Sequence, residues 1–583
     1  MATILINGTE YPIPEGEKLN AIQMAKRVGV EIPYYCWHPS LSVVANCRMC
    51  EVEVGSKDPK TGEVKMMPKL VPGCQTPAKD GTVLVTDSAK VQEHQRMIME
   101  LLLLNHPLDC PVCDQAGECG LQDYSYEHGQ SNHRFVEERI VNPRKDVSDL
   151  IQLNQDRCIM CTRCVRFTRE ITQTAELQVM RRGNHAEIAT FPGVSLDDNP
   201  LAGNVVDLCP VGALLDKDFL HKQRVWFLAK HDSVCTHCST GCNISVEENK
   251  GKIWRVKPRN NPHVNDYWIC DEGRYGYKDD SAPDDLLEAM YVLKGDDHVA
   301  VAIDEAVRLV DRGLKQAVIG GRTVAGVLSP FLTVEEAYLM ATYLKGMTSD
   351  AVLAVGPVPA RGEDRTFSPD KSAGRSGDTS FLAPRPFTIH AEKAPNARGV
   401  RAVIEHVQGA VVEYDELLRK VEAGEVGALY VASGSPTDWI DEPTAAKVRE
   451  KVAFLVVQDS RVGALAHKAD VVLAGGTYAE KAGSYVNADG RIQYAGASLP
   501  PRDGSLPDLD LFAVLLDRPG GPARSSDVLA ELAEAAPAFA AAKGGTLPLY
   551  GATLEASASS PRENGPPPFV DAWYAAMGAA KAR

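Results

Sequence analysis

The sequence predicts a multidomain α+β protein with a cysteine-rich front part and an α/β rear part. The chain has 583 residues, too many for one hydrophobic core, so roughly three to five domains are expected. All fifteen cysteines lie between Cys36 and Cys270. After about residue 285, helix-like and strand-like segments alternate, which is typical of an α/β layer around a parallel sheet.

Residues 1–90 are predicted to form a small β-rich domain. Alternating residues at 3–7 and the Asn7-Gly8 turn predict a hairpin. Strand-like segments at 51–54 and 63–66 predict a second one. Between the hairpins, a helix is expected whose apolar side chains share one face: Leu19, Ile22, Ala25 and Val28.

A longer helix is predicted over 88–105, with Asp87 or Ser88 as its N-cap and Pro107 enforcing its end. The rear part is predicted to alternate between helices and strands. The helices are expected at 415–424, 444–451 and 462–469, and the strands at 428–433, 453–458 and 470–476. Pro and Gly predict a long connection over 355–398. An unpacked Ala-, Pro-, Gly- and Ser-rich tail is predicted from about 518, with its end anchored by Phe569, Trp573 and Tyr574.

Composition and charge indicate a globular chain that does not itself enter a membrane. Hydrophobic residues make up 44% and charged residues 24% of the chain, as in ordinary soluble domains. No apolar run reaches the roughly 18–20 residues of a membrane span. The start, MATILINGTE, lacks the pattern of a secretory signal. The net charge of −16 argues against a nucleic-acid partner, because phosphate contacts need clustered Lys and Arg.

The cysteines predict metal centres rather than disulfides, because a large chain without a secretory signal keeps its thiols reduced. With His106 they give sixteen candidate ligands, which is four sets of four. The first set is Cys36, Cys47, Cys50 and Cys74. Its order is that of a plant-type ferredoxin [2Fe–2S] site, although ten residues rather than four separate the first two cysteines. A four-cysteine zinc site is the alternative.

The second set lies in HPLDCPVCDQAGEC and comprises His106, Cys110, Cys113 and Cys119. Pro107, Pro111 and Gly117 keep this segment irregular enough to wrap a [4Fe–4S] cluster. A lone His is often structural. Here, however, His106 precedes three cysteines that lack a fourth ligand, so ligation is favoured over a packing or capping role.

The third set begins with CIMCTRC and comprises Cys158, Cys161, Cys164 and the distant Cys209. Pro210 follows Cys209, as in bacterial ferredoxin motifs, so a [4Fe–4S] cluster is predicted. The hypothesis here is that neighbouring arginines offset the negative charge of this cluster: Arg157, Arg163 and Arg166. The fourth set is Cys235, Cys238, Cys242 and Cys270. It also favours a [4Fe–4S] cluster, but zinc is a more credible alternative here than for the third set.

These four sets, in this order, resemble the large iron–sulfur subunit (the G subunit) of bacterial NADH–quinone oxidoreductase, respiratory complex I. The resemblance covers nearly all of residues 1–280 and rests on these strings: YCWHPSL, NCRMC, NHPLDCPVCDQAGECGLQD, RCIMCTRCVRF and CDEGRYGY. It implies a β-grasp [2Fe–2S] domain followed by loop-rich [4Fe–4S] domains. A fourth cluster occurs in some bacterial members, which implies a bacterial protein.

The rear part resembles a molybdopterin-oxidoreductase domain, on residues 469–493 and 393–400. No cysteine follows Cys270, so a thiolate-bound metal is excluded there, although a Ser or Asp ligand is not. The domain is also short for a working molybdenum enzyme. It is therefore expected to be a degenerate α/β scaffold without molybdenum. Its Gly-rich loops are interpreted as strand-end turns rather than phosphate-binding loops: Gly434, Gly475 and Gly476.

The expected domains follow from the motifs. They are a [2Fe–2S] domain at 1–90, a His/Cys₃ [4Fe–4S] segment at 91–145, a ferredoxin-like [4Fe–4S] segment at 146–225, a CxxCxxxC domain at 226–285, a molybdopterin-oxidoreductase-like domain at 286–517 and a tail at 518–583.

The expected function is one-electron transfer through one [2Fe–2S] and three [4Fe–4S] clusters. The resemblance implies a flavin- and NADH-binding partner, quinone-side iron–sulfur partners, and a peripheral position on the cytoplasmic side of the bacterial inner membrane. The first three clusters would lie on the main path and the fourth off it.

The sequence suggests three alternatives. A subunit of an NAD-linked formate dehydrogenase would share the four front sets. The second alternative is an iron-only hydrogenase or its diaphorase partner. A catalytic hydrogen cluster would need further cysteines downstream, which are absent from the sequence. A zinc-stabilised interaction scaffold would bind zinc in place of iron.

Overall fold

The computed structural model describes residues 2–136, 138–280, 285–369, 385–518 and 523–554. The chain divides into two compact units. Of the described residues, those up to 228 and those within 367–387 form the first unit, and those within 229–366 and 388–554 form the second. The first three ligand sets therefore belong to the first unit, and the fourth set belongs to the second unit with the rear domain.

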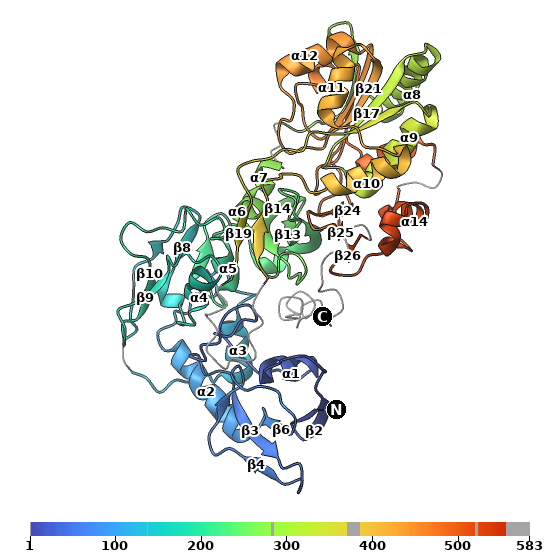
Figure 1. Ribbon diagram of the computed structural model, residues 1–583. Helices are drawn as coiled ribbons and strands as arrows, with labels where there is room; N and C mark the ends of the chain where they lie inside the picture. The colour runs from blue at the N-terminus through green and yellow to red at the C-terminus, as the bar shows by residue number, and fades with distance from the viewer. Residues whose placement is uncertain (1, 137, 281–284, 370–384, 519–522, 555–583) are drawn as a thin grey trace. The chain divides into compact units, whose positions relative to one another are not determined.

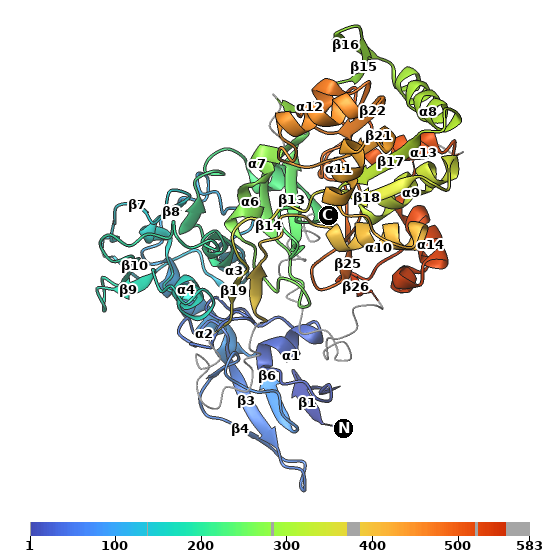
Figure 2. The ribbon, with the colours of Figure 1, turned by 45° about the horizontal axis from the view of Figure 1, so that its top comes forward.

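The first unit begins with a six-stranded sheet of order β2-β1-β6-β3-β4, in which β5 also pairs with β3. Its strands are β1 (Thr3–Ile6), β2 (Thr9–Pro12), β3 (Glu51–Lys57), β4 (Val64–Met66), β5 (Val71–Pro72) and β6 (Thr82–Val85). Helix α1 (Ala21–Arg27) lies against this sheet and shares its core (Figure 2). Both predicted hairpins and the predicted helix are confirmed.

After the six-stranded sheet, the first unit continues with helices and two small sheets. The Ser88 hydroxyl accepts from the Val91 amide at 3.3 Å, which confirms Ser88 as the N-cap of the predicted long helix. The helices are α2 (Ala89–Leu103), α3 (Gly120–His128), α4 (Arg163–Glu170), α5 (Asn204–Leu208), η1 (Gln155–Arg157) and η2 (Val225–Phe227). The strands are β7 (Lys145–Asp146), β8 (Ile151–Leu153) and β11 (Leu214–Asp216) in one sheet, and β9 (Gln178–Met180) and β10 (Glu187–Ala189) in another.

The second unit contains a seven-stranded sheet of order β16-β15-β23-β22-β21-β17-β18. Its strands are β15 (Met290–Lys294), β16 (Asp297–Val301), β17 (Thr323–Leu328), β18 (Val352–Val355), β21 (Val426–Ala432), β22 (Phe454–Asp459) and β23 (Val471–Ala474). Strands β17, β18, β21, β22 and β23 run parallel, which confirms the predicted parallel sheet.

Helices cover both faces of this sheet: α8 lies on one side, and α11 and α12 on the other (Figure 1). The sheet helices are α8 (Ile303–Ile319), α9 (Val334–Met347), α10 (Ala397–Gln408), α11 (Tyr414–Glu422) and α12 (Glu442–Lys451). Smaller elements carry the fourth set: β12 (Ala229–Val234), β13 (Asn243–Asn249), β14 (Lys252–Pro258), α6 (Asp271–Tyr275) and α7 (Tyr277–Asp280). Within the described residues, every helix is too short or too polar to span a bilayer.

The helix predicted over 462–469 is wrong. Only a 3₁₀ turn, η4 (Ala466–Lys468), forms there. Arg461 donates to Asp285 at 2.6 Å and so fixes the start of the segment, and Leu465 and Ala466 are drawn into the core. Tertiary packing therefore overrides the local helical pattern.

The prediction of an unpacked tail from about 518 is wrong for residues 523–554. This stretch holds α14 (Ser525–Ala535), η5 (Pro537–Ala542) and β26 (Ala552–Thr553), after α13 (Asp508–Leu515). Val528, Leu532 and Phe539 are buried in the rear core. The Ala-rich stretch therefore carries enough large apolar side chains to pack against that core. Strand β26 pairs with β25 (Arg491–Ala495), which pairs with β24 (Gly483–Val486).

The predicted anchors Phe569, Trp573 and Tyr574 lie outside the described residues. The predicted connection over 355–398 also lies partly outside them. Its described ends carry two short strands, β19 (Arg365–Phe367) and β20 (Phe387–Ile389), and α10 begins at its end.

A buried charged network joins α9 to the segment before β24. Lys481 Nζ lies 3.0 Å from Glu336 and 3.4 Å from Asp508, and all three side chains are almost fully buried. Next to it, the Glu335 carboxylate accepts from the Ser484 amide at 2.7 Å and from the Ser484 hydroxyl at 2.8 Å. These bonds satisfy polar groups that would otherwise be costly to bury.

Glu335 predicts a measurable pH dependence of stability. Burial raises its pKa from 4.5 to about 7. The folded state therefore holds the proton more tightly than the unfolded state, and stability falls as the pH rises from about 4.5 to about 7. In Glu335→Gln the amide oxygen still accepts from the Ser484 amide and the NH₂ group can donate to the Ser484 hydroxyl, so the variant stays bonded and removes this loss. The difference in the free energy of unfolding between the variant and the unsubstituted chain should therefore be up to about 3 kcal/mol more favourable to the variant at pH 8 than at pH 4.5.

Hydrogen exchange of peptides from β21 and β22 would report this difference in the full chain. Glu450→Gln, on the exposed surface of α12, is the matched control and should change nothing. If the stability of Glu335→Gln changed with pH in the same way as that of the unsubstituted chain, the prediction would be contradicted.

Candidate metal centres

All sixteen predicted ligands lie within the described residues. None of the fifteen cysteines forms a disulfide. Most are buried, but Cys110 is exposed and Cys158 is half-buried.

The first set comes from loops around the front sheet. Cys36 follows α1, Cys47 and Cys50 precede β3, and Cys74 follows β5. The Cys36 amide donates to Cys47 Sγ at 3.5 Å. A hydrogen bond from the Cys47 thiol lowers the pKa of Cys36 to about 6, and bonding to Cys50 together with burial raises the pKa of Cys74. The four thiols are therefore mutual neighbours.

The second set lies between α2 and α3. Cys119 stands directly before α3, and Cys110 and Cys113 add to the rise that burial causes in its pKa, to about 12. Gly212 contacts this set closely: a Cβ there would lie 2.3 Å from Cys113 Sγ, so glycine is required. The Cys-Pro-Val-Gly segment of the third set therefore packs directly on the second.

His106 has the properties of a neutral ligand. Burial, followed by the charge of Arg157, lowers its pKa to about 4, and the Arg157 backbone hydrogen-bonds its ring. Its Nδ1 atom is buried and has no hydrogen-bond partner among the described residues. Histidines that bind metal typically use one ring nitrogen for the metal and donate the other N–H to a carbonyl. The ring environment fits that role.

The third set surrounds a small cavity lined by all four of its thiols and by apolar side chains. Met160 and Thr162 adopt left-handed backbone conformations, with φ of 53° and 60°, which curl CIMCTRC around that cavity. Burial raises the pKa of Cys161 to about 11, and the charge of Arg163 opposes that rise. Cys164 lies on α4, and Cys209 directly follows α5.

The fourth set is held by β12, β13 and α6. The Cys235 amide donates to the Cys242 carbonyl at 2.8 Å, which closes the loop between β12 and β13. Cys270 caps α6 and accepts from the Gly273 amide at 3.4 Å. Burial raises the pKa of Cys242 well above its ordinary value, and Cys235, Cys238 and Cys270 add to that rise. The four thiols are again neighbours.

No three His, Cys, Asp or Glu side chains of the described residues surround a point suited to one metal ion. Ligands of an iron–sulfur cluster bind different irons, so they are spread over a cage rather than gathered at one point. The grouping of the thiols fits such a cage. The buried Nδ1 of His106, without a hydrogen-bond partner among the described residues, is available as a metal ligand beside the second set.

Arginines supply positive charge to these sites. Arg163 and Arg166 act on the third set, as predicted. The hypothesis for Arg157 stays a prediction. Its guanidinium donates to Asp109 at 3.0 and 2.8 Å and acts on His106 and Cys113 of the second set. Arg224, which sequence reasoning missed, donates to the Cys113 carbonyl at 2.7 Å. No spacing in the sequence links it to that loop.

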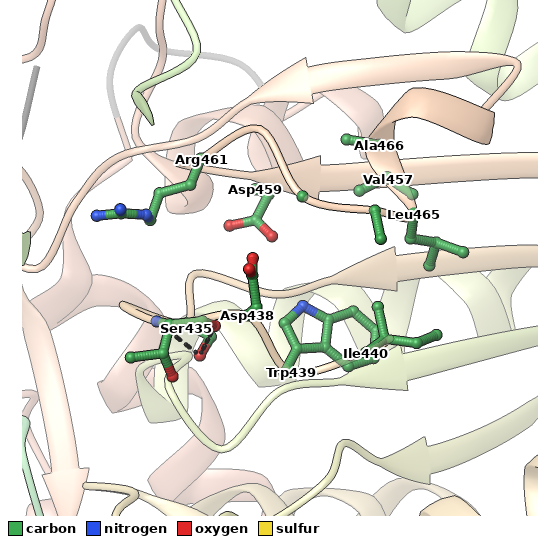
Figure 3. Close-up of a pocket in the computed structure, with 12 residues that line it drawn as sticks. Ser435, Asp438, Trp439, Ile440, Val457, Asp459, Arg461, Leu465 and Ala466 are labelled. Atoms are coloured by element: carbon green, nitrogen blue, oxygen red, sulfur yellow. Dashed lines mark hydrogen bonds between the residues drawn. The ribbon is translucent and has the colours of Figure 1, made fainter. Parts of the chain in front are cut away.

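The rear sheet has a pocket at the carboxyl ends of its parallel strands. Asp438 follows β21 and Asp459 ends β22, and their carboxylates point toward each other beside Trp439 (Figure 3). Burial raises the pKa of Asp459 to about 6. Arg461 lines the same pocket, which therefore holds charges of both signs.

The Gly-rich loops behave as turns at strand ends. Gly434, at φ 66°, follows β21 within two residues. Gly475 allows close packing, because a Cβ there would lie 2.5 Å from Asp508 Oδ1.

Family comparisons divide the chain in the same order as these centres. The matches are a "2Fe-2S iron-sulfur cluster binding domain" (1–89), an "NADH-ubiquinone oxidoreductase-G iron-sulfur binding region" (95–134), an "NADH-quinone oxidoreductase subunit 3, ferredoxin-like domain" (148–215), a "Molybdopterin oxidoreductase Fe4S4 domain" (228–279) and a "Molybdopterin oxidoreductase" family (388–518). Domains that bind [2Fe–2S] and [4Fe–4S] clusters are therefore present.

Three relatives illustrate the similarity. The NADH-quinone oxidoreductase G subunit of Rickettsia felis is 33% identical over 60% of this chain, and the chain spans only about half of that relative, 50%. The G subunit of Streptomyces coelicolor is 30% identical, over 89% of this chain and 63% of the relative. The mitochondrial NADH-ubiquinone oxidoreductase 78 kDa subunit of Neurospora crassa is 32% identical, over 85% of this chain and 77% of that subunit. The chain therefore belongs to the family of NADH-quinone oxidoreductase G subunits and their mitochondrial 78 kDa counterparts.

Proposed function

We propose that the chain is an electron-transfer subunit of an NADH–quinone oxidoreductase and holds one [2Fe–2S] and three [4Fe–4S] clusters. The observation that carries this proposal is the grouping of all fifteen cysteines into four sets of neighbouring thiols, with His106 beside the second. No cysteine is left outside a set. Such clusters accept and pass on one electron at a time.

The ligands in this proposal follow the four sets. They are Cys36, Cys47, Cys50 and Cys74 for the [2Fe–2S] cluster, and His106 with Cys110, Cys113 and Cys119 for the first [4Fe–4S] cluster. Cys158, Cys161, Cys164 and Cys209 would hold the next, and Cys235, Cys238, Cys242 and Cys270 the last. The boundaries 1–90, 91–145, 146–225 and 226–285 assign one cluster to each segment. The rear domain, 286–517, would serve as a scaffold without molybdenum.

The proposed partners are a flavin- and NADH-binding subunit and quinone-side iron–sulfur subunits of the same complex. The chain would lie on the cytoplasmic side of the bacterial inner membrane, held there by the complex. The second set supports contact with a redox partner, because it is the set with an exposed thiol, Cys110. Exposed apolar side chains accompany it: Leu108, Val112, Trp226 and Phe227.

Metal content tests the proposal first. The full chain, purified without oxygen, should contain about 14 irons, the sum of one [2Fe–2S] and three [4Fe–4S] clusters. Cys270→Ser should remove the EPR signal of one [4Fe–4S] cluster and leave the other signals, because Cys270 belongs to the fourth set alone. Ser233→Ala, next to the same loop, is the control. Zinc in place of iron would reject the proposal.

His106 predicts the potential of its cluster. A neutral imidazole leaves a cluster less negative than a thiolate does, so His106→Cys should lower the midpoint potential by on the order of 100 mV. Redox titration followed by EPR measures this shift. His185→Cys, which adds a thiol at an exposed position, is the control. An unchanged potential in the His106 variant would show that His106 is not a ligand.

The exposed surface at the second set predicts a docking site for a partner subunit. Arg224 stacks 5.1 Å above the Trp226 ring and donates to the Cys113 carbonyl, so this surface is tied to the cluster loop. Val112→Glu should reduce the amount of complex that copurifies with the chain, because it places a charge in an apolar contact. Iron content should not change. Val141→Glu, at another exposed position, is the control. Equal recovery of both variants in the complex would contradict the prediction.

A further inference from the structure

One buried guanidinium lies between the first and third ligand sets. Arg166 belongs to α4 and is 2% exposed. It donates to the Cys36 carbonyl of the first set and to the Cys161 carbonyl of the third, the latter at 3.4 Å. It also donates to the Ser42 carbonyl. A single side chain therefore bonds directly to the backbone of both ligand loops.

The Nε–H of this guanidinium takes part in none of these bonds. Arg166 Nε is buried and has no hydrogen-bond partner among the described residues. A buried N–H without a partner is costly, so such a group normally faces an acceptor. The Cys36 and Cys161 thiols both act electrostatically on Arg166, which places its charge close to both ligand sets.

A buried carboxylate completes the arrangement. Glu170, one turn further along α4, is 1% exposed and accepts from the Ser42 amide at 2.9 Å and the Ser42 hydroxyl at 2.6 Å. Its charge also acts on Arg166. Arg166 and Glu170, which both belong to α4, therefore both hydrogen-bond to Ser42. These bonds fix the loop that follows Cys36 against α4.

We propose that Arg166 is a shared positioning residue that holds the first and third cluster sites together and stabilises the electron-rich form of both clusters. This inference rests on the proposed function. Its physical basis is that a fixed positive charge in a water-poor interior interacts strongly with nearby negative charge. A guanidinium presents several donors in one rigid plane, so it can bond to two loops at once, whereas a lysine ammonium acts as a compact point charge.

The proposal differs from a purely structural role in what it predicts. A residue needed only for folding would alter cluster content without a common change in potential. A shared charge must move both midpoint potentials in one direction, and must leave the second and fourth clusters unchanged. Glu170 must act in the opposite sense, because it opposes the charge of Arg166.

The test is EPR-monitored redox titration of the full chain, purified without oxygen and reduced with dithionite and mediators. Arg166→Gln should shift the first and third midpoint potentials to more negative values. Glu170→Gln, which keeps both bonds to Ser42, should shift both to more positive values. Arg166→Lys should reverse most of the shift seen with Gln. Arg182→Gln, at an exposed position of the same unit, is the matched control and should shift neither.

Several outcomes would overturn the inference. They are unchanged potentials in Arg166→Gln, a shift confined to one cluster, or an equal shift at all four. Should Arg166→Gln fail to fold, Glu170→Gln decides: unchanged potentials at normal iron content would overturn the inference. Absence of cluster signals from the unsubstituted chain would reject the proposed function itself, whereas normal signals with unshifted variants would reject only the role of Arg166.

Discussion

The burial of thiol groups is the constraint on which the rest of the cysteine-rich part depends. Burial raises the pKa of thiols in the second, third and fourth sets, Cys119, Cys164 and Cys242 among them. A metal ligand must be a thiolate, so cluster binding has to release protons and place negative charge in a water-poor interior. Backbone N–H groups and buried arginines offset that cost. Arg163 and Arg166 do so on the third set, and Arg157 on the second.

Compact loops are the second requirement, because ligands from separate segments must meet around one cage. Left-handed backbone conformations at Met160 and Thr162 turn the chain within CIMCTRC. Gly212 lets the loop after Cys209 approach Cys113, where any side chain would collide with its sulfur. The second and third sets therefore depend on one another for their shape.

The rear domain follows a different principle. Its parallel strands are covered on both faces, and its core extends into α14 and η5 (Figure 1). Buried charges within it are paired rather than aimed at a ligand, as Lys481 shows with Glu336 and Asp508. These features agree with a supporting domain.

The sequence by itself determined the grouping of the cysteines into four sets of neighbours, the first sheet and its helix, and the parallel strands, because these depend on local spacing and periodicity. Cysteine spacing identifies partners within a loop, and apolar alternation identifies strands, without knowledge of distant contacts. Only the tertiary structure decided that Arg157 serves the second set, that Arg224 contacts the Cys113 loop, and that 462–469 is not a helix. It also decided that residues 523–554 pack into the rear core. Each of these depends on residues distant in sequence, whose contacts no local pattern records. The position of Arg166 between two ligand sets is of the same kind: the carbonyls of Cys36 and Cys161, far apart along the chain, meet one guanidinium only after the chain has folded.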